Sequence, residues 1–195
     1  AMADWIIALL DSLDVNAACL VGHSQGCLVT IDAAARYPDR VARVGLIAGA
    51  LAIPVNDHLL SLSDKALSKA IQAMISWGHG PMGHMHDNTQ PGHSFLGFGN
   101  QLMAANNQNA LKNDLIACNK YKNGKDSASK IQQPALCILA EKDKMTPLKS
   151  GQQMANALIR GQVTLIESAG HMLPAEFPNE VNTALRNFLN ETDKS

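Results

Sequence analysis

The pentapeptide Gly22-His23-Ser24-Gln25-Gly26 lies between two segments of different character. The apolar run at residues 17–21 has the length of a short buried strand. Residues 25–37 space their apolar side chains as a helix does, and Pro38 stops the pattern. We therefore predict a strand, a sharp turn that the glycines permit, and a helix, which is the start of a unit typical of parallel sheets.

Further segments continue this alternation of strands and helices. Residues 4–13 have the apolar spacing of an amphipathic helix, and residues 41–48 are apolar nearly throughout, as a parallel strand covered on both faces should be. After Pro134, two more apolar runs alternate with helical patterns, and they predict strands at 135–140 and 163–166 and helices at 147–158 and 178–189. The expected fold class is α/β with a mostly parallel sheet.

The middle of the chain interrupts this alternation. Residues 63–77 have helical spacing, and residues 78–109 are rich in Gly, His and Asn, with no strand alternation. We therefore predict a core formed by residues 1–49 and 131–195, with residues 50–130 as a helical insertion.

Composition excludes several classes of function. The 195 residues carry 16 Lys and Arg against 17 Asp and Glu, so the net charge of -1 attracts neither nucleic acid nor an anionic membrane. No apolar stretch reaches the roughly 20 residues of a membrane helix. The cysteines lack CxxC spacing, which argues against a disulfide framework and favours a cytoplasmic location. Apolar neighbours predict that Cys19 and Cys27 are packed, unreactive thiols.

Ser24 is the candidate nucleophile. The flanking glycines permit a strained turn that raises its hydroxyl above the sheet edge, and the backbone N–H of Gln25 at the helix start could stabilise an oxyanion. The alternative is a glycine-rich turn in which Ser24 only caps the helix.

A serine nucleophile needs a base, and the base needs a carboxylate that fixes its tautomer. Asp143 follows the predicted strand 135–140, and His171 follows the predicted strand 163–166. Because the carboxyl ends of parallel strands share one edge, both side chains are expected beside Ser24. Asp57, a few residues after the strand at 41–48, is a second and less favoured candidate for the carboxylate.

The chain order Ser, Asp, His resembles that of the α/β-hydrolase family, as do GHSQG, AARYPDRVARVGLIAG, PALCILAEKDKMTP and SAGHMLPAEFPNEVNTALRNFL. The similarity covers residues 4–50 and 131–190, and it is greatest to serine esterases, C–C hydrolases and non-haem haloperoxidases. The resemblance implies Ser24 as nucleophile, His171 as base and then acid, Asp143 as its orienting carboxylate and Gln25 as oxyanion donor. It also implies that the insertion is a helical cap over the site and that no cofactor is needed.

Two features depart from the family's pattern. Cys27 stands where the family usually has a second small glycine. Family members also open with several strands and a loop that supplies a second oxyanion donor, whereas this sequence begins at the helix before the nucleophile strand. We therefore expect the C-terminal part of a longer enzyme, poorly active alone. The strand at 17–21 would then be an open edge, available to another chain or to the absent N-terminal segment.

The expected reaction is hydrolysis of a small, fairly apolar carboxylic ester through an acyl-enzyme. The same triad would also serve a C–C hydrolase, a perhydrolase or haloperoxidase, or a hydroxynitrile lyase, and receptors on this fold keep the triad for ligand sensing.

His23 and Met172, which flank the predicted nucleophile and base, are expected in the substrate pocket. Other methionines could add an adaptable apolar wall, namely Met74, Met82, Met85 and Met103. The insertion is also rich in histidine, but its histidines lack a recognised metal-ligand spacing, and we expect a polar loop and no metal at His79, His84, His86 and His93.

Overall fold

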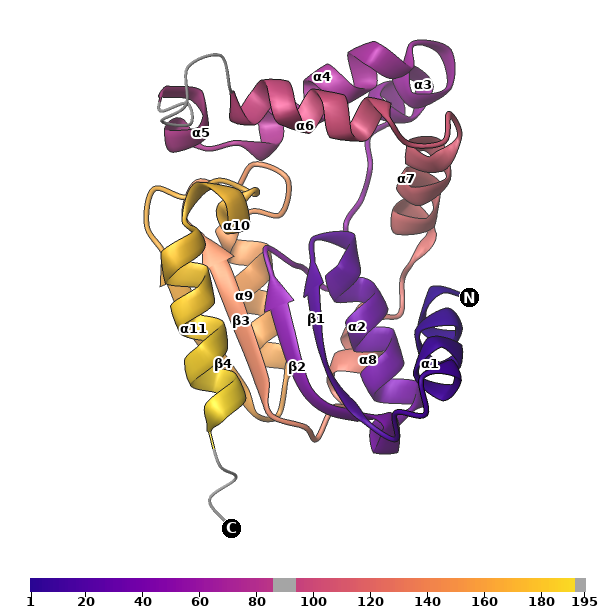
Figure 1. Ribbon diagram of the computed structural model, residues 1–195, viewed down its shortest axis with the longest axis vertical. Coiled ribbons are helices and arrows are strands. Elements are labelled where there is room, and N and C mark those ends of the chain that lie inside the picture. The colour runs from indigo at the N-terminus through magenta and orange to yellow at the C-terminus, as the bar shows by residue number, and fades with distance from the viewer. Residues whose placement is uncertain (86–93, 192–195) are drawn as a thin grey trace.

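The structure, a computed structural model, describes residues 1–85 and 94–191. Within these residues four strands form a parallel sheet in the order β1-β2-β3-β4. They are β1 (Ala18–His23), β2 (Val41–Ile47), β3 (Ala135–Ala140) and β4 (Gly161–Ile166). Figure 1 shows their carboxyl ends at one edge of the sheet. The predicted α/β class with a parallel sheet is confirmed.

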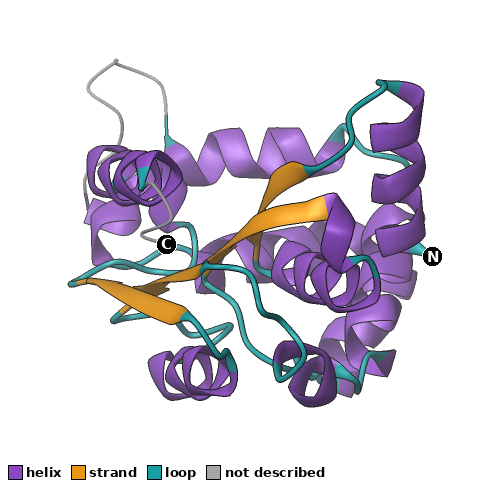
Figure 2. Ribbon diagram, turned by 90° about the horizontal axis from the view of Figure 1, so that it is seen from below, coloured by secondary structure: helices purple, strands orange, loops and turns teal. Residues whose placement is uncertain are grey.

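Helices cover both faces of the sheet (Figure 2). One face carries α2 (Gln25–Arg36), α8 (Gly124–Ala128) and α9 (Leu148–Ala157), with α1 (Met2–Ser12) packed against α2. The other face carries α10 (Leu173–Glu176) and α11 (Pro178–Asn190). A short 3-10 helix, η1 (Pro38–Arg40), leads from α2 into β2.

Side chains of β3 divide between the two faces. Leu136 and Ile138 pack with Phe188 of α11, whereas Cys137 and Leu139 belong to the apolar cluster under α2, α8 and α9. Successive side chains of a strand point to opposite faces, so a strand covered on both sides must be apolar at every position. This requirement explains the unbroken apolar run from which β3 was predicted.

A group of helices lies between β2 and β3 in the sequence and is here called the cap. It comprises α3 (Asp57–Lys65), α4 (Leu67–Gly78), α5 (Pro81–Met85), α6 (Phe95–Ala104) and α7 (Ala110–Lys120). Figure 1 shows α3 to α6 beyond the carboxyl ends of the strands, while α7 descends towards α2. The range 50–130 stays a prediction for the insertion; α8, inside that range, packs on α2.

The helical spacing of residues 63–77 corresponds to two helices, the end of α3 and nearly all of α4. The chain forms α3 and α4, which are separated at Ala66, where φ is -151° and ψ is 62°. Ala66 is neither Gly nor Pro, and the apolar spacing continues past it. Nothing in the local pattern therefore marks the break.

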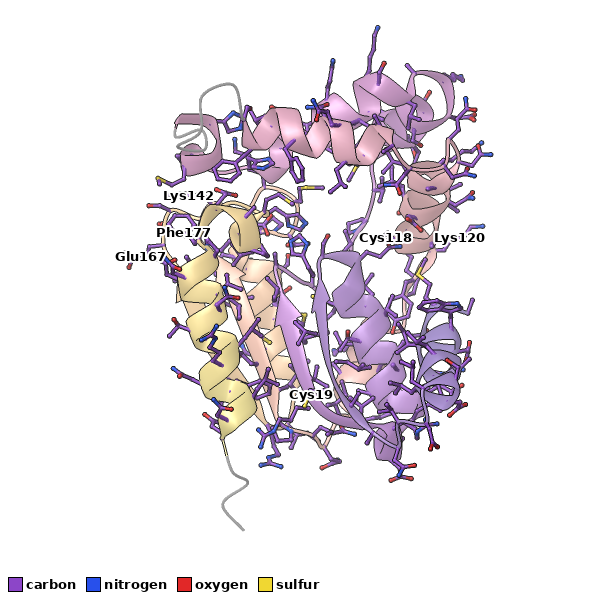
Figure 3. The ribbon with its side chains drawn as sticks, in the orientation of Figure 1. Cys19, Cys118, Lys120, Lys142, Glu167 and Phe177 are labelled. Atoms are coloured by element: carbon purple, nitrogen blue, oxygen red, sulfur yellow. The ribbon has the colours of Figure 1, made fainter. Side chains whose placement is uncertain are left out.

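Strand β1 forms one edge of the described sheet. Leu20 packs on the face covered by α2, so Cys19 and Val21 point to the opposite face, where both are exposed. The prediction that Cys19 is a packed thiol is therefore wrong. Figure 3 shows Cys19 towards the end of β1 that is farther from the cap. Among residues 1–85 and 94–191, no helix is long and apolar enough to span a bilayer.

Candidate active site

Ser24 occupies a strained turn between β1 and α2. Its φ is 54° and its ψ is -119°, a conformation rare for a residue with a side chain. A hydrogen bond to β2 stabilises the turn: the Ser24 N–H donates to the Ile47 carbonyl at 2.9 Å. It is also tight: a Cβ added to Gly22 would lie 2.3 Å from the Gly26 carbonyl, whereas one added to Gly26 would meet open space.

Gln25 is the first residue of α2. Its backbone N–H therefore has no carbonyl partner in a preceding turn, and it lies at the positive end of the helix dipole. The Gln25 side chain donates a 2.9 Å hydrogen bond from Nε2 to the backbone carbonyl of Asp114 in α7. Figure 3, which labels Cys118 and Lys120, shows this part of α7 reaching down towards α2. The start of α2 thus contacts the cap.

His171 and Asp143 form a buried pair beyond the ends of β4 and β3. His171 Nδ1 lies 2.9 Å from Asp143 Oδ2, and the two residues are 3% and 6% exposed. The second carboxylate oxygen, Oδ1, accepts hydrogen bonds of 2.8 Å from the N–H groups of Met145 and Thr146. The Thr146 hydroxyl lies 2.7 Å from Asp143 Oδ2 and 2.8 Å from the Ala48 carbonyl, so it joins the carboxylate to the end of β2.

The hydrogen bonds decide the charge of Asp143. Burial by itself would raise the pKa of this carboxyl, but the bond and charge of His171, together with the Thr146 donors, hold the pKa below its ordinary value. An ionised carboxylate only accepts hydrogen bonds, so His171 Nδ1 carries the proton and Nε2 is free to act as a base. Asp57, the other candidate, is an exposed residue at the start of α3.

His23 connects the Ser24 turn to the loop at residues 167–172, which contains His171 and is here called the histidine loop. Its Nε2 donates a 2.8 Å hydrogen bond to the backbone carbonyl of His171, and the two imidazole rings are 5.0 Å apart. Burial lowers the pKa of His23, and the nearby His171 lowers it further. In the described residues the His171 ring is hydrogen-bonded to Asp143 and not to the Ser24 hydroxyl. Contacts of this kind often tighten only when substrate is bound.

A cleft of about 440 Å³ opens at Ser24 and is lined by both core and cap. Its apolar wall comes from the segments after β2 and β3 and from α3, α4 and α7, and it includes Ile53, Pro54, Val55, Leu59, Met74, Trp77, Leu111, Leu115 and Met145. Its polar lining includes Asn56, Asp114 and Lys144. Apolar clefts with a few polar groups are typical of small-molecule sites.

The predicted pocket residues divide unevenly. His23 and Met74 line the cleft. Met172 does not; it lies against Gly78, where an added Cβ would be 3.4 Å from Met172 Cγ. Met82 and Met103 are also outside the lining of this cleft, and the side chain of Met85 lies outside the described part of the structure.

The thiols of Cys118, which lines the cleft, and of the buried Cys27 are unreactive. Burial raises the pKa of Cys118 to about 11 and the pKa of Cys27 further still, so both thiols stay protonated at neutral pH.

Residues 1–85 and 94–191 contain no group of three or more His, Cys, Asp and Glu that could hold a metal ion. His79 is buried, with Nδ1 2.9 Å from the Ile75 carbonyl, and His84 is exposed. His86 and His93 lie outside the described residues.

Sequence reasoning missed two residues that hold this site. Thr146 had a local signal, because an aspartate followed two and three residues later by backbone N–H groups that bind its side chain forms a common turn. Glu176, which binds the loop before His171, had none, because one of its partners is 96 positions away.

A parallel sheet with a strained serine at a strand-to-helix turn and a buried Asp-His pair beyond the following strands defines the α/β-hydrolase class. The chain belongs to this family: the model of the Alpha/beta hydrolase family matches residues 1–184.

The proteins that this chain resembles do not all carry the name of one activity. Protein ABHD8 of Mus musculus is 25% identical over 97% of this chain, and the chain spans 43% of that protein. Carboxylesterase YbfK of Bacillus subtilis is 26% identical over 96% of this chain, and the chain spans 62% of that protein. Among solved structures, a bromoperoxidase from Bacillus anthracis superposes with a TM-score of 0.84 at 20% identity, covering 97% of this chain and 73% of that one. At that identity, the superposition shows the shared fold alone.

Proposed function

We propose that this chain is a serine hydrolase that cleaves small, apolar carboxylic esters through an acyl-enzyme. The observation that carries the proposal is the buried His171–Asp143 pair, which contacts the strained Ser24 turn through the hydrogen bond from His23. The Asp-His pair provides an oriented base, and the turn presents a nucleophile in the lining of the cleft.

The first half of the proposed reaction forms the acyl-enzyme. His171 Nε2 accepts the Ser24 hydroxyl proton while Oγ attacks the ester carbonyl carbon, and the ionised Asp143 stabilises the resulting imidazolium. The carbonyl oxygen becomes an oxyanion that accepts a hydrogen bond from the Gln25 backbone N–H. The bond to the alcohol oxygen then breaks, and the imidazolium protonates the departing alkoxide.

The second half releases the acid. His171 accepts a proton from water as the water oxygen attacks the acyl carbon, and a second tetrahedral intermediate forms on the same oxyanion donor. Its collapse breaks the bond to Ser24 Oγ, which regains a proton from His171. Atoms balance as one water consumed for one alcohol and one acid released.

The lining of the cleft supports an apolar acyl group. Leu59, Met74 and Leu111 surround a space of about 440 Å³, which suits a short or medium aliphatic chain better than a polar one. The relative named as a carboxylesterase supports the ester linkage as substrate class.

The test is hydrolysis of p-nitrophenyl esters from acetate to laurate, with intact-mass detection of an acyl adduct. Ser24→Ala and His171→Ala should abolish turnover, and Asp143→Asn should lower kcat by about 10⁴-fold because it fixes the wrong tautomer. Asp57→Asn is the matched control and should keep wild-type activity, since Asp57 is exposed on α3. Hydrolysis that persists in Ser24→Ala, or equal losses in the two Asp→Asn variants, would refute the proposed triad.

A further inference from the structure

The cap and the loop before His171 touch backbone to backbone. Gly80 lies between α4 and α5, and Gly170 immediately precedes His171. A Cβ added to Gly80 would lie 2.5 Å from the Gly170 nitrogen, and one added to Gly170 would lie 2.1 Å from the Gly80 nitrogen. No side chain fits at either position, so the two segments meet at a contact that only paired glycines allow.

One carboxylate oxygen holds both sides of this contact. Glu176 Oε2 accepts hydrogen bonds from the Gly80 N–H at 3.0 Å and from the Gly170 N–H at 3.2 Å. Figure 1 shows α10, which ends at Glu176, below α5 of the cap. A third bond, from the Met172 N–H to the Gly78 carbonyl at 2.9 Å, joins the same two segments. His171 thus lies between Gly170, which is joined to Gly80 through Glu176, and Met172, which bonds directly to Gly78.

The burial of Glu176 is unfavourable for a residue whose role is only structural. It is 8% exposed, and its other oxygen, Oε1, is buried and has no hydrogen-bond partner among the described residues. Burying a carboxylate with one oxygen unsatisfied costs free energy that an apolar side chain of similar size would not. An acceptor is nevertheless needed here, because two backbone N–H groups converge on one point and would otherwise be left unpaired.

We propose that Glu176 is a positioning residue that couples the seating of the cap to the placement of His171, by binding Gly80 of the cap and Gly170 of the histidine loop through one oxygen. The inference rests on the proposed function in that His171 is taken as the base. When the cap segment at Gly80 shifts, the shared oxygen and the Gly170 N–H shift with it, and His171 moves relative to Ser24. The cleft and the base are thereby assembled together.

The variants are chosen to separate the acceptor from the charge. Glu176→Gln keeps an oxygen that can accept from both N–H groups and places its amide nitrogen where Oε1 has no partner. Glu176→Leu removes the acceptor at similar volume. Glu180→Leu is the matched control, because Glu180 is an exposed glutamate in the first turn of α11.

Three measurements on the whole chain test the coupling. They are amide hydrogen exchange at Gly80 and Gly170, the NMR signal of the His171 Nδ1 proton, and the rate at which a fluorophosphonate labels Ser24. In Glu176→Leu we expect faster exchange at both glycines, a broadened or lost Nδ1 proton signal and labelling slower by about 10- to 100-fold. Glu176→Gln should restore all three towards wild type, and Glu180→Leu should change none.

Each outcome decides for or against the coupling. Unchanged exchange and an unchanged Nδ1 signal in Glu176→Leu would overturn it, as would faster exchange at Gly80 alone, which would make Glu176 an anchor of the cap only. An equal loss in Glu176→Gln and Glu176→Leu would also overturn it, because the charge rather than the shared acceptor would then matter. A wild-type chain that is not labelled would count against the proposed function, and the exchange and NMR measurements would still decide the coupling.

Discussion

His23 and Thr146 both act on the Asp-His pair without belonging to it. Thr146 supplies one backbone and one hydroxyl donor to Asp143, and His23 holds the backbone carbonyl of His171. Groups that fix the orientation of reacting side chains contribute to rate although they touch no substrate, because small displacements of a base are costly. The proposed chemistry at Ser24 is therefore expected to depend on residues outside the proposed triad.

His23 also predicts a pH dependence of stability. Its pKa in the folded chain is below the ordinary value of 6.5, mainly because it is buried. Between those two values the unfolded chain binds a proton that the folded chain does not, so the free energy of unfolding falls as pH drops below about 6.5. The slope from this one group is at most about 1.4 kcal/mol per pH unit.

Glutamine at this position keeps an N–H donor for the His171 carbonyl and cannot titrate in this range. Urea unfolding of His23→Gln between pH 5 and about pH 8 should therefore show a shallower fall in stability on the acid side than wild type. Superimposable pH profiles for the two proteins would show that His23 is not kept neutral by the fold.

At the scale of elements, the two glycines of the turn between β1 and α2, Gly22 and Gly26, have different surroundings. An added Cβ at Gly22 meets the Gly26 backbone at 2.3 Å, but one at Gly26 meets nothing within 4 Å. Gly22→Ala should thus lower the free energy of unfolding by about 1 to 3 kcal/mol, as overpacking does. Gly26→Ala should be neutral or stabilising by up to about 1 kcal/mol, because Ala favours the helix. Thermal unfolding of the pair checks this, and equal losses in both variants would contradict it.

Patterns in the local sequence predicted the strands that are formed by buried apolar runs. They did not predict features that depend on contacts between distant segments. Residues 135–140 are buried at every position, and the predicted strand matches β3 at both ends. The break at Ala66 and the exposure of Cys19 depend on how neighbouring elements pack, and no local residue encodes either. The nearness of Asp143 and His171 could be predicted because a parallel sheet brings its carboxyl ends to one edge, while their roles beside Ser24 stay a prediction.

The residues that support the site could not be predicted, because their contacts join segments that are distant in the sequence. Glu176 binds Gly80, 96 positions earlier, and Gln25 reaches a backbone carbonyl in α7. Such bonds join segments whose mutual position is fixed only in the folded molecule, so spacing in the sequence carries no trace of them. The apolar lining of the cleft was predicted in character, through Met74, but not in its other members.

At the scale of the whole molecule, the open edge at β1 predicts self-association. Val21 is 45% exposed on this edge strand and Trp5 of α1 is 64% exposed, and both line an apolar groove of about 340 Å³ beside β1. Unpaired apolar strand edges recruit other strands. We expect the 195-residue chain to show a mass that rises with concentration in light scattering.

A charge on the edge should reduce this association. Val21→Lys is expected to lower the apparent mass, whereas Leu189→Lys, at a 42% exposed position of helix α11 and on neither edge strand, should leave it unchanged. A monodisperse wild-type monomer at all concentrations would contradict the expectation, and so would an equal effect of both substitutions.

The central claim is that Ser24 is a nucleophile activated by His171. Its most direct test is fluorophosphonate labelling followed by peptide mass spectrometry, because the reagent needs one attack by an activated serine and no particular substrate. The account predicts a single adduct on the peptide that contains Ser24, absent from Ser24→Ala and His171→Ala. An unlabelled wild-type chain, or an adduct that survives in His171→Ala at the wild-type rate, would contradict it.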